Sequence, residues 1–246
     1  MTKVRLDQLL VDRGLAESKT RAQAIIMAGN VFTGTRRLDK AGDKVAEDIA
    51  IEVKGEPHPW VSRGGLKLEK GLAEFALDPT GMTAIDVGAS TGGFTDVLLT
   101  KGAARVYAVD VGHGQLAWKL RNDPRVTVME RTNARRLDES LVPEPVDLVV
   151  CDASFIGLEV VLPAALALTK PGARLIALIK PQFEVGKGRV GKGGVVREPE
   201  LHKEVCDRIE AWVAGLPGWR VLGITESPIK GPEGNVEFLI GAARDA

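Results

Sequence analysis

Two apolar runs of the sequence end on charged side chains. The run "LIALIK" ends on Lys180 in front of Pro181, and the run "VDLVVCD" ends on Asp152. A lysine in such a position often marks only the place where a strand reaches solvent, and this interpretation stays open from the sequence alone. An amine whose charge is disfavoured by its surroundings can instead act as a general base. The pair therefore points to proton abstraction by a lysine beside a carboxylate as the chemistry to test.

Two more charged residues can join this pair if the chain folds as an open α/β sheet. Lys67 lies in "SRGGLKLEKG", a helix-compatible stretch, and Glu237 lies in the last apolar run, "NVEFLIGAA". Two ammonium groups close together disfavour the doubly charged state, while two carboxylates keep that effect moderate. The predicted catalytic residues are therefore Lys67, Asp152, Lys180 and Glu237.

The elements that must position these residues lie between 62 and 246, where β-rich runs alternate with helix-compatible stretches. This alternation predicts an α/β fold with a doubly wound, mostly parallel sheet. The connection between the last two runs, "RVLGITESPI" and "NVEFLIGAA", is too short for a crossover helix, so they should pair as an antiparallel hairpin near the sheet edge. Such a hairpin is typical of Rossmann-like methyltransferases that use S-adenosylmethionine, whereas plain dinucleotide-binding sheets usually lack it.

A glycine-rich turn follows the first run of this sheet. In "IDVGASTGGF" the glycines allow the backbone to approach a ligand closely, but they do not spell GxGxxG. Asp86 lies where it would repel a pyrophosphate. A cofactor without phosphates that carries an amino acid group fits this turn better.

Asp110 ends the second run of the sheet, where a carboxylate can accept hydrogen bonds from the two hydroxyls of an adenosine ribose. With the turn and the hairpin, it favours S-adenosylmethionine over a nicotinamide cofactor. Asn133 and Ala134 either contact the adenine or belong to an ordinary loop. The predicted cofactor-binding residues are Asp86, Gly88, Ala89, Ser90, Gly92, Gly93, Phe94, Asp110, Asn133, Ala134 and Asp152.

The first 53 residues have a different pattern. Two short helices are predicted in "VRLDQLLVDRG" and "ESKTRAQAIIMAGN", and short strands follow them. The basic residues near the helix starts form either a phosphate-binding face or an ordinary solvated face. Residues 5–34 resemble the S-four-type RNA-binding module, which implies RNA contacts from Arg5, Lys19, Arg21 and Gln23. Residues 54–61, which contain two prolines, are predicted to form a linker.

The stretch "EVGKGRVGKGGVVREPE" is rich in glycine and basic residues. We interpret it as an RNA-facing lid that is too flexible and too basic to belong to the core, with phosphate contacts from Lys187, Arg189, Lys192 and Arg197. A disordered surface loop without a ligand is the alternative.

The composition limits the other classes of function. The chain has 246 residues, 44% of them hydrophobic, and its formal net charge is zero, so any polyanion must be bound by local basic patches. It contains no apolar run of about 18 residues and no signal peptide pattern, which predicts a cytoplasmic protein without a membrane span. The two cysteines form no CxxC pair, so we expect neither a disulfide framework nor a metal site. We expect the protein to act as a monomer.

The four predicted catalytic residues match, in order and approximate spacing, the Lys-Asp-Lys-Glu tetrad of FtsJ-type 2′-O-ribose methyltransferases. With the S-four-type module and the motifs "VSRGGLKL", "DVGASTGGFTD", "CDASFIGL", "LIKPQFEVG", "GKGGVVREPELH" and "GNVEFL", the whole chain resembles the TlyA family. The linker departs from the family in one place, because His58 stands where an arginine is usual.

This resemblance implies a Rossmann-like class I methyltransferase with a mostly parallel seven-stranded sheet in residues 62–246, preceded by a small α+β RNA-binding domain in residues 1–53. The implied activity is 2′-O-methylation of ribosomal RNA, in the free RNA or in ribosomal subunits, with S-adenosylmethionine as the methyl donor. Lys180 would take up the hydroxyl proton, Asp152 would orient it, Lys67 would add positive charge, and Glu237 would hold the lysines in register.

Two other functions remain open from the sequence. A non-catalytic RNA-binding or ribosome-assembly factor could keep the same fold, although its tetrad need not be intact as it is here. The family has also been described as haemolysins, which suggests a membrane-lysing protein. The chain has neither a spanning segment nor a long basic amphipathic helix to support that activity.

Overall fold

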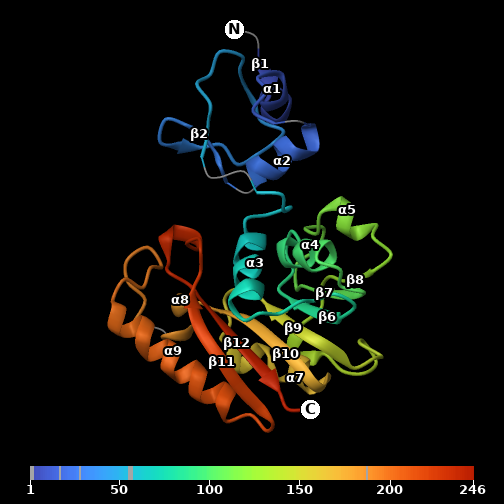
Figure 1. Ribbon diagram of the computed structural model, residues 1–246. Helices are drawn as coiled ribbons and strands as arrows, with labels where there is room; N and C mark the ends of the chain where they lie inside the picture. The colour runs from blue at the N-terminus through green and yellow to red at the C-terminus, as the bar shows by residue number, and fades with distance from the viewer. Residues whose placement is uncertain (1–2, 17, 28, 55–57, 187) are drawn as a thin grey trace. The chain divides into compact units, whose positions relative to one another are not determined.

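The computed structural model of the protein describes residues 3–16, 18–27, 29–54, 58–186 and 188–246. The chain divides into two compact units, Met1–Arg63 and Gly64–Ala246 (Figure 1). The predicted linker at 54–61 falls in the first unit, and residues 55–57 of it lie outside the described residues.

The first unit packs two short helices on small strands. Its core consists of side chains from both helices and the strand that follows them, among them Leu6, Leu10, Ile26 and Val31. The Oγ of Ser18 accepts a hydrogen bond from the Arg21 N–H at 3.2 Å and so caps the second helix. In chain order the elements are β1 (Lys3–Arg5), α1 (Leu6–Asp12), α2 (Lys19–Met27), β2 (Val31–Thr33), β3 (Arg36–Arg37), β4 (Lys44–Ala46) and β5 (Glu52–Val53).

The strands of the first unit form two small sheets. β1 pairs antiparallel with β4, and β2 lies between β3 and β5 in a three-stranded sheet. The sequence pattern predicted helices first and strands afterwards, whereas the structure also has the strand β1 in front of the first helix. A three-residue segment is too short to show the alternation that identifies a strand in sequence.

Seven strands form the sheet of the second unit, within the region 62–246 where β-rich runs were predicted to alternate with helices. They are β6 (Thr83–Val87), β7 (Arg105–Val109), β8 (Val126–Met129), β9 (Val146–Cys151), β10 (Thr169–Ile179), β11 (Trp219–Glu226) and β12 (Phe238–Arg244). Their order in the sheet is β11-β12-β10-β9-β6-β7-β8. The strands from β10 to β8 are parallel, and β12 is antiparallel to both of its neighbours. The predicted Rossmann-like sheet with a terminal antiparallel hairpin is confirmed.

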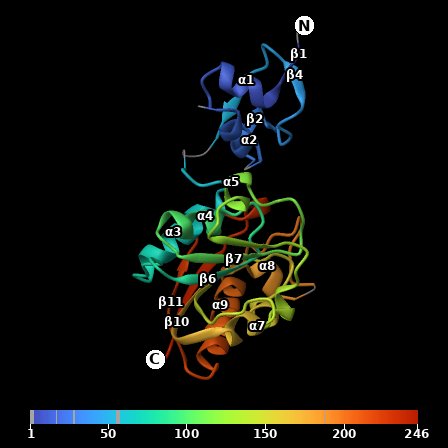
Figure 2. The same ribbon diagram turned by 90° about the vertical axis from the view of Figure 1, so that its right-hand side faces the viewer.

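Helices cover both faces of this sheet. Figure 2 shows α3 and α4 on one side and α7 and α9 on the other. The helices are α3 (Gly64–Glu74), α4 (Gly93–Thr100), α5 (Trp118–Arg121), α6 (Leu158–Val161), α7 (Pro163–Ala167), α8 (Pro181–Glu184) and α9 (Pro199–Ala214), with two 3₁₀ turns, η1 (Ala134–Arg136) and η2 (Pro232–Gly234). Within the described residues, none of the helices of the protein is long and apolar enough to cross a membrane.

The carboxyl ends of the parallel strands meet at one edge of the sheet. Asp110 follows β7, Asp152 follows β9 and Lys180 follows β10, and the strand residues directly before them, 106–109, 148–151 and 175–179, are apolar and buried. Because ligands of open α/β sheets lie beyond these strand ends, the fold brings residues that are far apart in sequence to one crevice.

Candidate functional site

The four residues predicted to be catalytic form one chain of alternating charges. The Nζ of Lys180 lies 2.6 Å from Oδ1 of Asp152, and the Nζ of Lys67 lies 2.6 Å from Oε2 of Glu237. Lys67 also lies 3.8 Å from Oδ2 of Asp152, which joins the two pairs. Lys180 is only 6% exposed and Glu237 is fully buried. The interpretation of Lys180 as a solvated surface residue is therefore wrong.

The ammonium group of Lys180 is held by three oxygens. It donates hydrogen bonds to the carbonyl of Asp152 and to Oγ of Ser154, both at 3.0 Å, in addition to the ion pair with the Asp152 carboxylate. The strand end fixes the lysine backbone, and these partners fix the far end of its side chain. Ser154 was not predicted from the sequence, although it lies in the "CDASFIGL" motif.

Glu237 lies in a close-fitting site. Its Oε1 accepts a hydrogen bond from Nε2 of Gln182 at 3.1 Å, and its backbone carbonyl accepts one from the Ser227 N–H at 2.8 Å. A Cβ atom on Gly231 would lie 2.2 Å from Oε1, so residue 231 must be glycine for this carboxylate to be where it is. The second carboxylate of the site is thus positioned by its own hairpin and by the residue two positions after Lys180.

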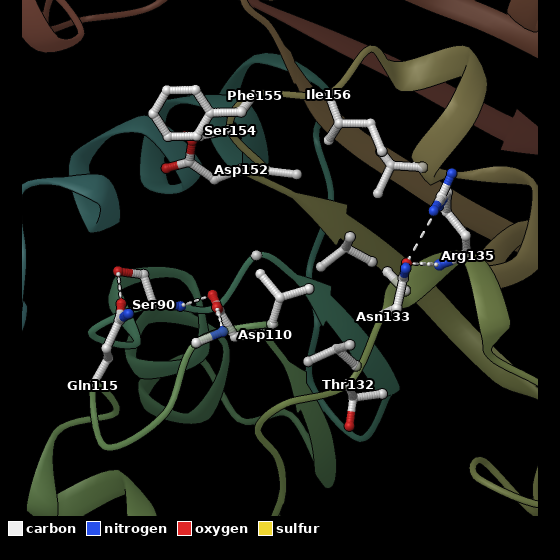
Figure 3. Close-up of a pocket in the computed structure, with 18 residues that line it drawn as sticks. Ser90, Asp110, Gln115, Thr132, Asn133, Arg135, Asp152, Ser154, Phe155 and Ile156 are labelled. Carbon is white, nitrogen blue, oxygen red and sulfur yellow. Dashed lines mark hydrogen bonds between the residues drawn. The ribbon is translucent and has the colours of Figure 1, made fainter.

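A cavity of about 630 Å³ lies beside the Asp152–Lys180 pair, at the carboxyl ends of β6, β7 and β9. Figure 3 shows Asp152, Ser154 and Phe155 on one side of it and Ser90, Asp110 and Gln115 on another. The described charged residues that line the cavity are two aspartates, Asp110 and Asp152, and one arginine, Arg135. This balance suits a ligand that carries positive charge better than one that carries a pyrophosphate.

Asp110 is held by backbone donors on both sides. Its Oδ2 accepts a hydrogen bond from the Ser90 N–H at 2.8 Å and its Oδ1 accepts one from the Gly112 N–H at 2.7 Å. Each carboxylate oxygen keeps a further lone pair for a ligand. Gly88 has φ +83°, and a Cβ there would lie 2.8 Å from the backbone of Ala153, so the first turn of the sheet packs tightly against the loop after β9.

The other predicted cofactor residues divide into two groups. The cavity is lined by six of them, Gly88, Ser90, Asp110, Asn133, Ala134 and Asp152. The five that do not line it are Asp86, Ala89, Gly92, Gly93 and Phe94. Gly92 is required for packing, because a Cβ there would lie 2.3 Å from the Leu120 side chain. The side chain of Asn133 caps η1 by accepting a hydrogen bond from the Arg135 N–H at 3.1 Å.

Asp86 is a fully buried carboxyl under the first turn. Its Oδ2 accepts hydrogen bonds from the N–H and the hydroxyl of Thr95, at 3.0 and 2.7 Å, whereas its Oδ1 has no hydrogen-bond partner among the described residues. Burial raises the pKa of Asp86 to about 7, the charge of Asp152 adds to the effect, and the Thr95 hydrogen bonds oppose it.

The raised pKa of Asp86 predicts a pH-dependent stability. The folded protein keeps this proton up to about pH 7, whereas the unfolded chain loses it near pH 4. Between about pH 4 and pH 7 the carboxyl of Asp86 ionises in the unfolded chain but stays protonated in the folded protein. The free energy of unfolding therefore falls as the pH rises through this range, and it stays lowered at higher pH. We expect Asp86→Asn to be more stable than the wild type at pH 8 by on the order of 2–4 kcal/mol, with a smaller difference at pH 5. Thermal unfolding of both proteins at the two pH values, without cofactor, measures this difference, and an equal difference at both values would contradict it.

The predicted RNA contacts of the first unit are partly occupied by intramolecular partners. Arg5 pairs with the buried Asp7 at 2.7 Å, and Gln23 donates to the same carboxylate at 2.9 Å, which holds the pKa of Asp7 well below its usual range. Arg21 donates to the backbone carbonyls of His58 and Trp60. Lys19 is exposed.

The glycine-rich segment packs into the core near its end. Arg189 pairs with Glu204 at 2.5 Å, Lys192 and Arg197 are exposed, and Lys187 lies outside the described residues. The expectation that the segment is too flexible and too basic to be core is wrong for Val195 and Val196, which are 7% and 1% exposed. Buried Asn235 fixes this part, because its side chain accepts from the Val196 N–H at 3.1 Å and donates to the Gly194 carbonyl at 3.0 Å.

Phe155 is an aromatic residue at the mouth of the cavity that sequence reasoning did not single out. It is 89% exposed, has a positive φ of +65°, and its ring centroid lies 4.9 Å from that of Phe183. A large apolar side chain held in this conformation and exposed to solvent indicates a contact surface. The signal available in sequence was its position three residues after Asp152.

Two family models match the chain: an S4 domain over residues 4–48 and an FtsJ-like methyltransferase over residues 60–244. The Mycobacterium tuberculosis protein named 16S/23S rRNA (cytidine-2′-O)-methyltransferase TlyA is 48% identical over 239 residues, which are 97% of this chain and 89% of the relative. The chain belongs to the TlyA family of FtsJ-like methyltransferases. Another relative of the chain, Hemolysin A of Brachyspira hyodysenteriae, is 39% identical over 237 residues, 96% of this chain and 98% of that protein.

Solved structures agree with this assignment. A structure from Streptococcus thermophilus has 44% sequence identity and a TM-score of 0.77. The match covers 100% of this chain and 90% of that chain. An O-methyltransferase from Bacillus cereus has a TM-score of 0.54 at 16% identity, covering 97% of this chain and 96% of its own, and this likeness supports the fold alone. The resemblance to the TlyA family that the sequence motifs indicated is confirmed.

Proposed function

We propose that this TlyA-family methyltransferase transfers a methyl group from S-adenosylmethionine to a ribose 2′-hydroxyl of ribosomal RNA. The observation that carries the proposal is the Glu237–Lys67–Asp152–Lys180 chain of ion pairs, whose Asp152 lines a ligand-sized cavity at the strand ends. The name of the Mycobacterium tuberculosis relative, an rRNA (cytidine-2′-O)-methyltransferase, supports the choice of RNA and of the ribose oxygen.

The residues around the cavity fit S-adenosylmethionine. Asp110 would accept hydrogen bonds from the ribose hydroxyls, Gly88 and Ser90 would line the amino acid end, and Asn133 with Ala134 would lie against the adenine. The excess of carboxylates over cations in the wall favours a ligand with ammonium and sulfonium groups. When bound, this cofactor supplies a methyl group that is electrophilic without a metal ion.

The protein's own residues would prepare the ribose oxygen. Lys180 would take up the hydroxyl proton at Nζ as the oxygen becomes nucleophilic, after losing a proton of its own to solvent. Asp152 lies 2.6 Å from that nitrogen, so it would orient the lysine and stabilise the ammonium ion that forms. Ser154 would keep Nζ in place through its hydroxyl.

Lys67 and Glu237 would act on the charge of the site. Lys67 is shared between Glu237 at 2.6 Å and Asp152 at 3.8 Å, so its positive charge partly compensates the negative charges of both carboxylates. Its positive charge would also stabilise the developing alkoxide. Glu237 in turn keeps Lys67 from moving.

The basic residues outside the cavity would bind the RNA backbone. Lys19 in the S4 domain and Lys192 with Arg197 in the glycine-rich segment are exposed. Four further residues would exchange their intramolecular partners for RNA phosphates: Arg5, Arg21, Gln23 and Arg189. Lys187, which lies outside the described residues, would also contact a phosphate. The substrate would be met in the cytoplasm.

Incubation with methyl-labelled S-adenosylmethionine and ribosomal RNA or subunits tests the proposed function. Digestion of the RNA to nucleosides, followed by mass spectrometry, should reveal a 2′-O-methylated nucleoside that is absent without the protein. Binding of the RNA without any methyl transfer would instead favour a non-catalytic assembly factor.

The exposed Phe155 predicts a separable effect on RNA. Because aromatic side chains stack on unpaired bases, Phe155→Ala should raise KM for RNA by about 5- to 100-fold, which corresponds to the loss of one stacking contact. The dissociation constant of S-adenosylmethionine should change much less. Steady-state kinetics with each substrate varied in turn measures both effects. Phe155→Tyr, which keeps the ring, is the matched control, and an unchanged KM in Phe155→Ala would argue against a base contact.

A further inference from the structure

The segment that begins at Lys180 holds the loop after β9 at three points. The Nζ of Lys180 bonds to Ser154, the ring of Phe183 packs on Phe155, and the carboxylate of Glu184 accepts a hydrogen bond from the Leu158 N–H at 2.8 Å. The first two contacts belong to the site described above. The contact between Glu184 and Leu158 lies at the far end of the loop, outside that site.

Glu184 supplies a cap that the helix α6 lacks in its own sequence. The N-cap residue of α6 is Gly157, which has no side chain that could accept a hydrogen bond. The N–H of the next residue, Leu158, is at the first helical position, where the helix itself supplies no acceptor. Oε1 of Glu184, which is 26 residues away in the chain, accepts that N–H. A Cβ at position 157 would lie 3.0 Å from the other carboxylate oxygen, so the glycine leaves room for this contact.

Arg208 of α9 keeps the Glu184 carboxylate in place. Its Nη2 donates to Oε2 of Glu184 at 2.8 Å and to the Glu184 carbonyl at 3.0 Å, and its Nη1 lies 2.8 Å from Glu159 of α6. The Glu184 side chain is 4% exposed, whereas that of Arg208 is 40% exposed. The buried Glu184 carboxylate therefore connects α8 with α6 through Leu158 and with α9 through Arg208.

The Glu184–Leu158 contact lies at the end of the loop 152–158, which contains a residue in an unfavourable backbone conformation. Phe155 has a positive φ of +65°, a conformation that costs energy for a bulky residue and persists only when the surroundings enforce it. Residues 152–156 of the same loop line the cavity. Release of the loop at Leu158 would let it relax, and the Ser154 hydroxyl would move away from Lys180.

We propose that Glu184 is a positioning residue of the methyl transfer reaction, which sets the loop 152–158 over the cavity by capping α6 and is itself fixed by Arg208. This inference rests on the proposed function for its kinetic part. Its structural part, the dependence of the loop on the Glu184 carboxylate, holds for any reaction at this site.

Hydrogen–deuterium exchange of the full-length protein, without RNA, tests the structural part. In Glu184→Ala the peptide that covers 154–162 should exchange about tenfold faster or more than in the wild type, because a hydrogen bond to a charged acceptor is lost. Glu184→Gln keeps an oxygen for the Leu158 N–H and should exchange more slowly than Glu184→Ala. Arg208→Gln frees the carboxylate and should also raise exchange of this peptide, which keeps the test available if Glu184→Ala does not fold. Glu159→Gln is the matched control on the same network and should behave as the wild type.

The kinetic part is tested with ribosomal subunits at saturating concentrations of both substrates. We expect kcat of Glu184→Ala to fall by about 10- to 100-fold, because small displacements of a reacting group have effects of this size. A residue that only stabilised the fold would lower the melting temperature and leave kcat at 25 °C unchanged, so unchanged kcat would overturn the proposal. Unchanged exchange in 154–162 would overturn it as well. If the wild type transfers no methyl group to ribosomal RNA, the proposed function fails, while the exchange experiment still decides the role of Glu184.

Discussion

Replacement of Lys180 by alanine is expected to lower methyl transfer to ribosomal RNA by about 10²- to 10⁴-fold, the usual contribution of a positioned general base. In the structure its Nζ is fixed by the Asp152 carboxylate at 2.6 Å and by two hydrogen bonds at 3.0 Å, next to the cavity that would hold the methyl donor. Lys67, the other lysine of the site, is held by Glu237 at 2.6 Å and lies 3.8 Å from Asp152. The rate of transfer from labelled S-adenosylmethionine measures the effect.

The control for this experiment is a lysine on the surface of the same unit. Lys203 on α9 is an exposed residue paired with Asp207, so Lys203→Ala should transfer methyl groups at the wild-type rate. Equilibrium dialysis should show that Lys180→Ala still binds S-adenosylmethionine, which would assign the loss to the chemical step. Transfer by Lys180→Ala at more than a tenth of the wild-type rate would remove the lysine from the proton transfer.

The sheet of the second unit could be predicted because its parallel strands contain mostly apolar stretches that end at the crevice. Parallel strands buried on both faces leave a strong signal of this kind, and the short connection before β12 indicated the hairpin. The convergence of Lys67, Asp152, Lys180 and Glu237 follows from that topology. The details of the site do not follow from it. Ser154 and Gln182 are ordinary polar residues in the sequence, and only three-dimensional contacts over 26 and 55 positions give them a role.

Glycine and charge patterns were less informative than strand patterns. Gly92 lies in a motif that suggests contact with a ligand, yet its Cβ position is filled by leucine side chains and its φ is +98°, so packing and backbone conformation explain the glycine. Arg5 was equally suited to a phosphate or to solvent, but the structure pairs it with the buried Asp7. A sequence shows that a charge is present and does not show which partner neutralises it.

The replacement of Glu237 by glutamine is expected to reduce both stability and activity. The Lys67–Glu237 pair is buried, with side chains 8% and 0% exposed, and removal of one partner from such a pair leaves an uncompensated charge. We expect a loss of about 3 kcal/mol, at the lower end of the usual range because Asp152 still lies 3.8 Å from Lys67. The melting temperature of this unit should fall by about 6–12 °C. Methyl transfer should fall by about 10²- to 10³-fold, because the positive charge near the ribose oxygen is no longer fixed.

The double variant Lys67→Met, Glu237→Gln separates these two effects. It removes both charges of the pair, and replacing a buried ion pair by neutral residues of similar size is often neutral or stabilising, so the melting temperature should return close to that of the wild type. The Asp152–Lys180 pair at 2.6 Å remains, and Gln182 can still donate to the new amide. Activity should stay as low as in Glu237→Gln, because the charge of Lys67 is absent. If methyl transfer recovers together with stability, Lys67 and Glu237 have only a structural role, and the reaction depends on Asp152 and Lys180 alone.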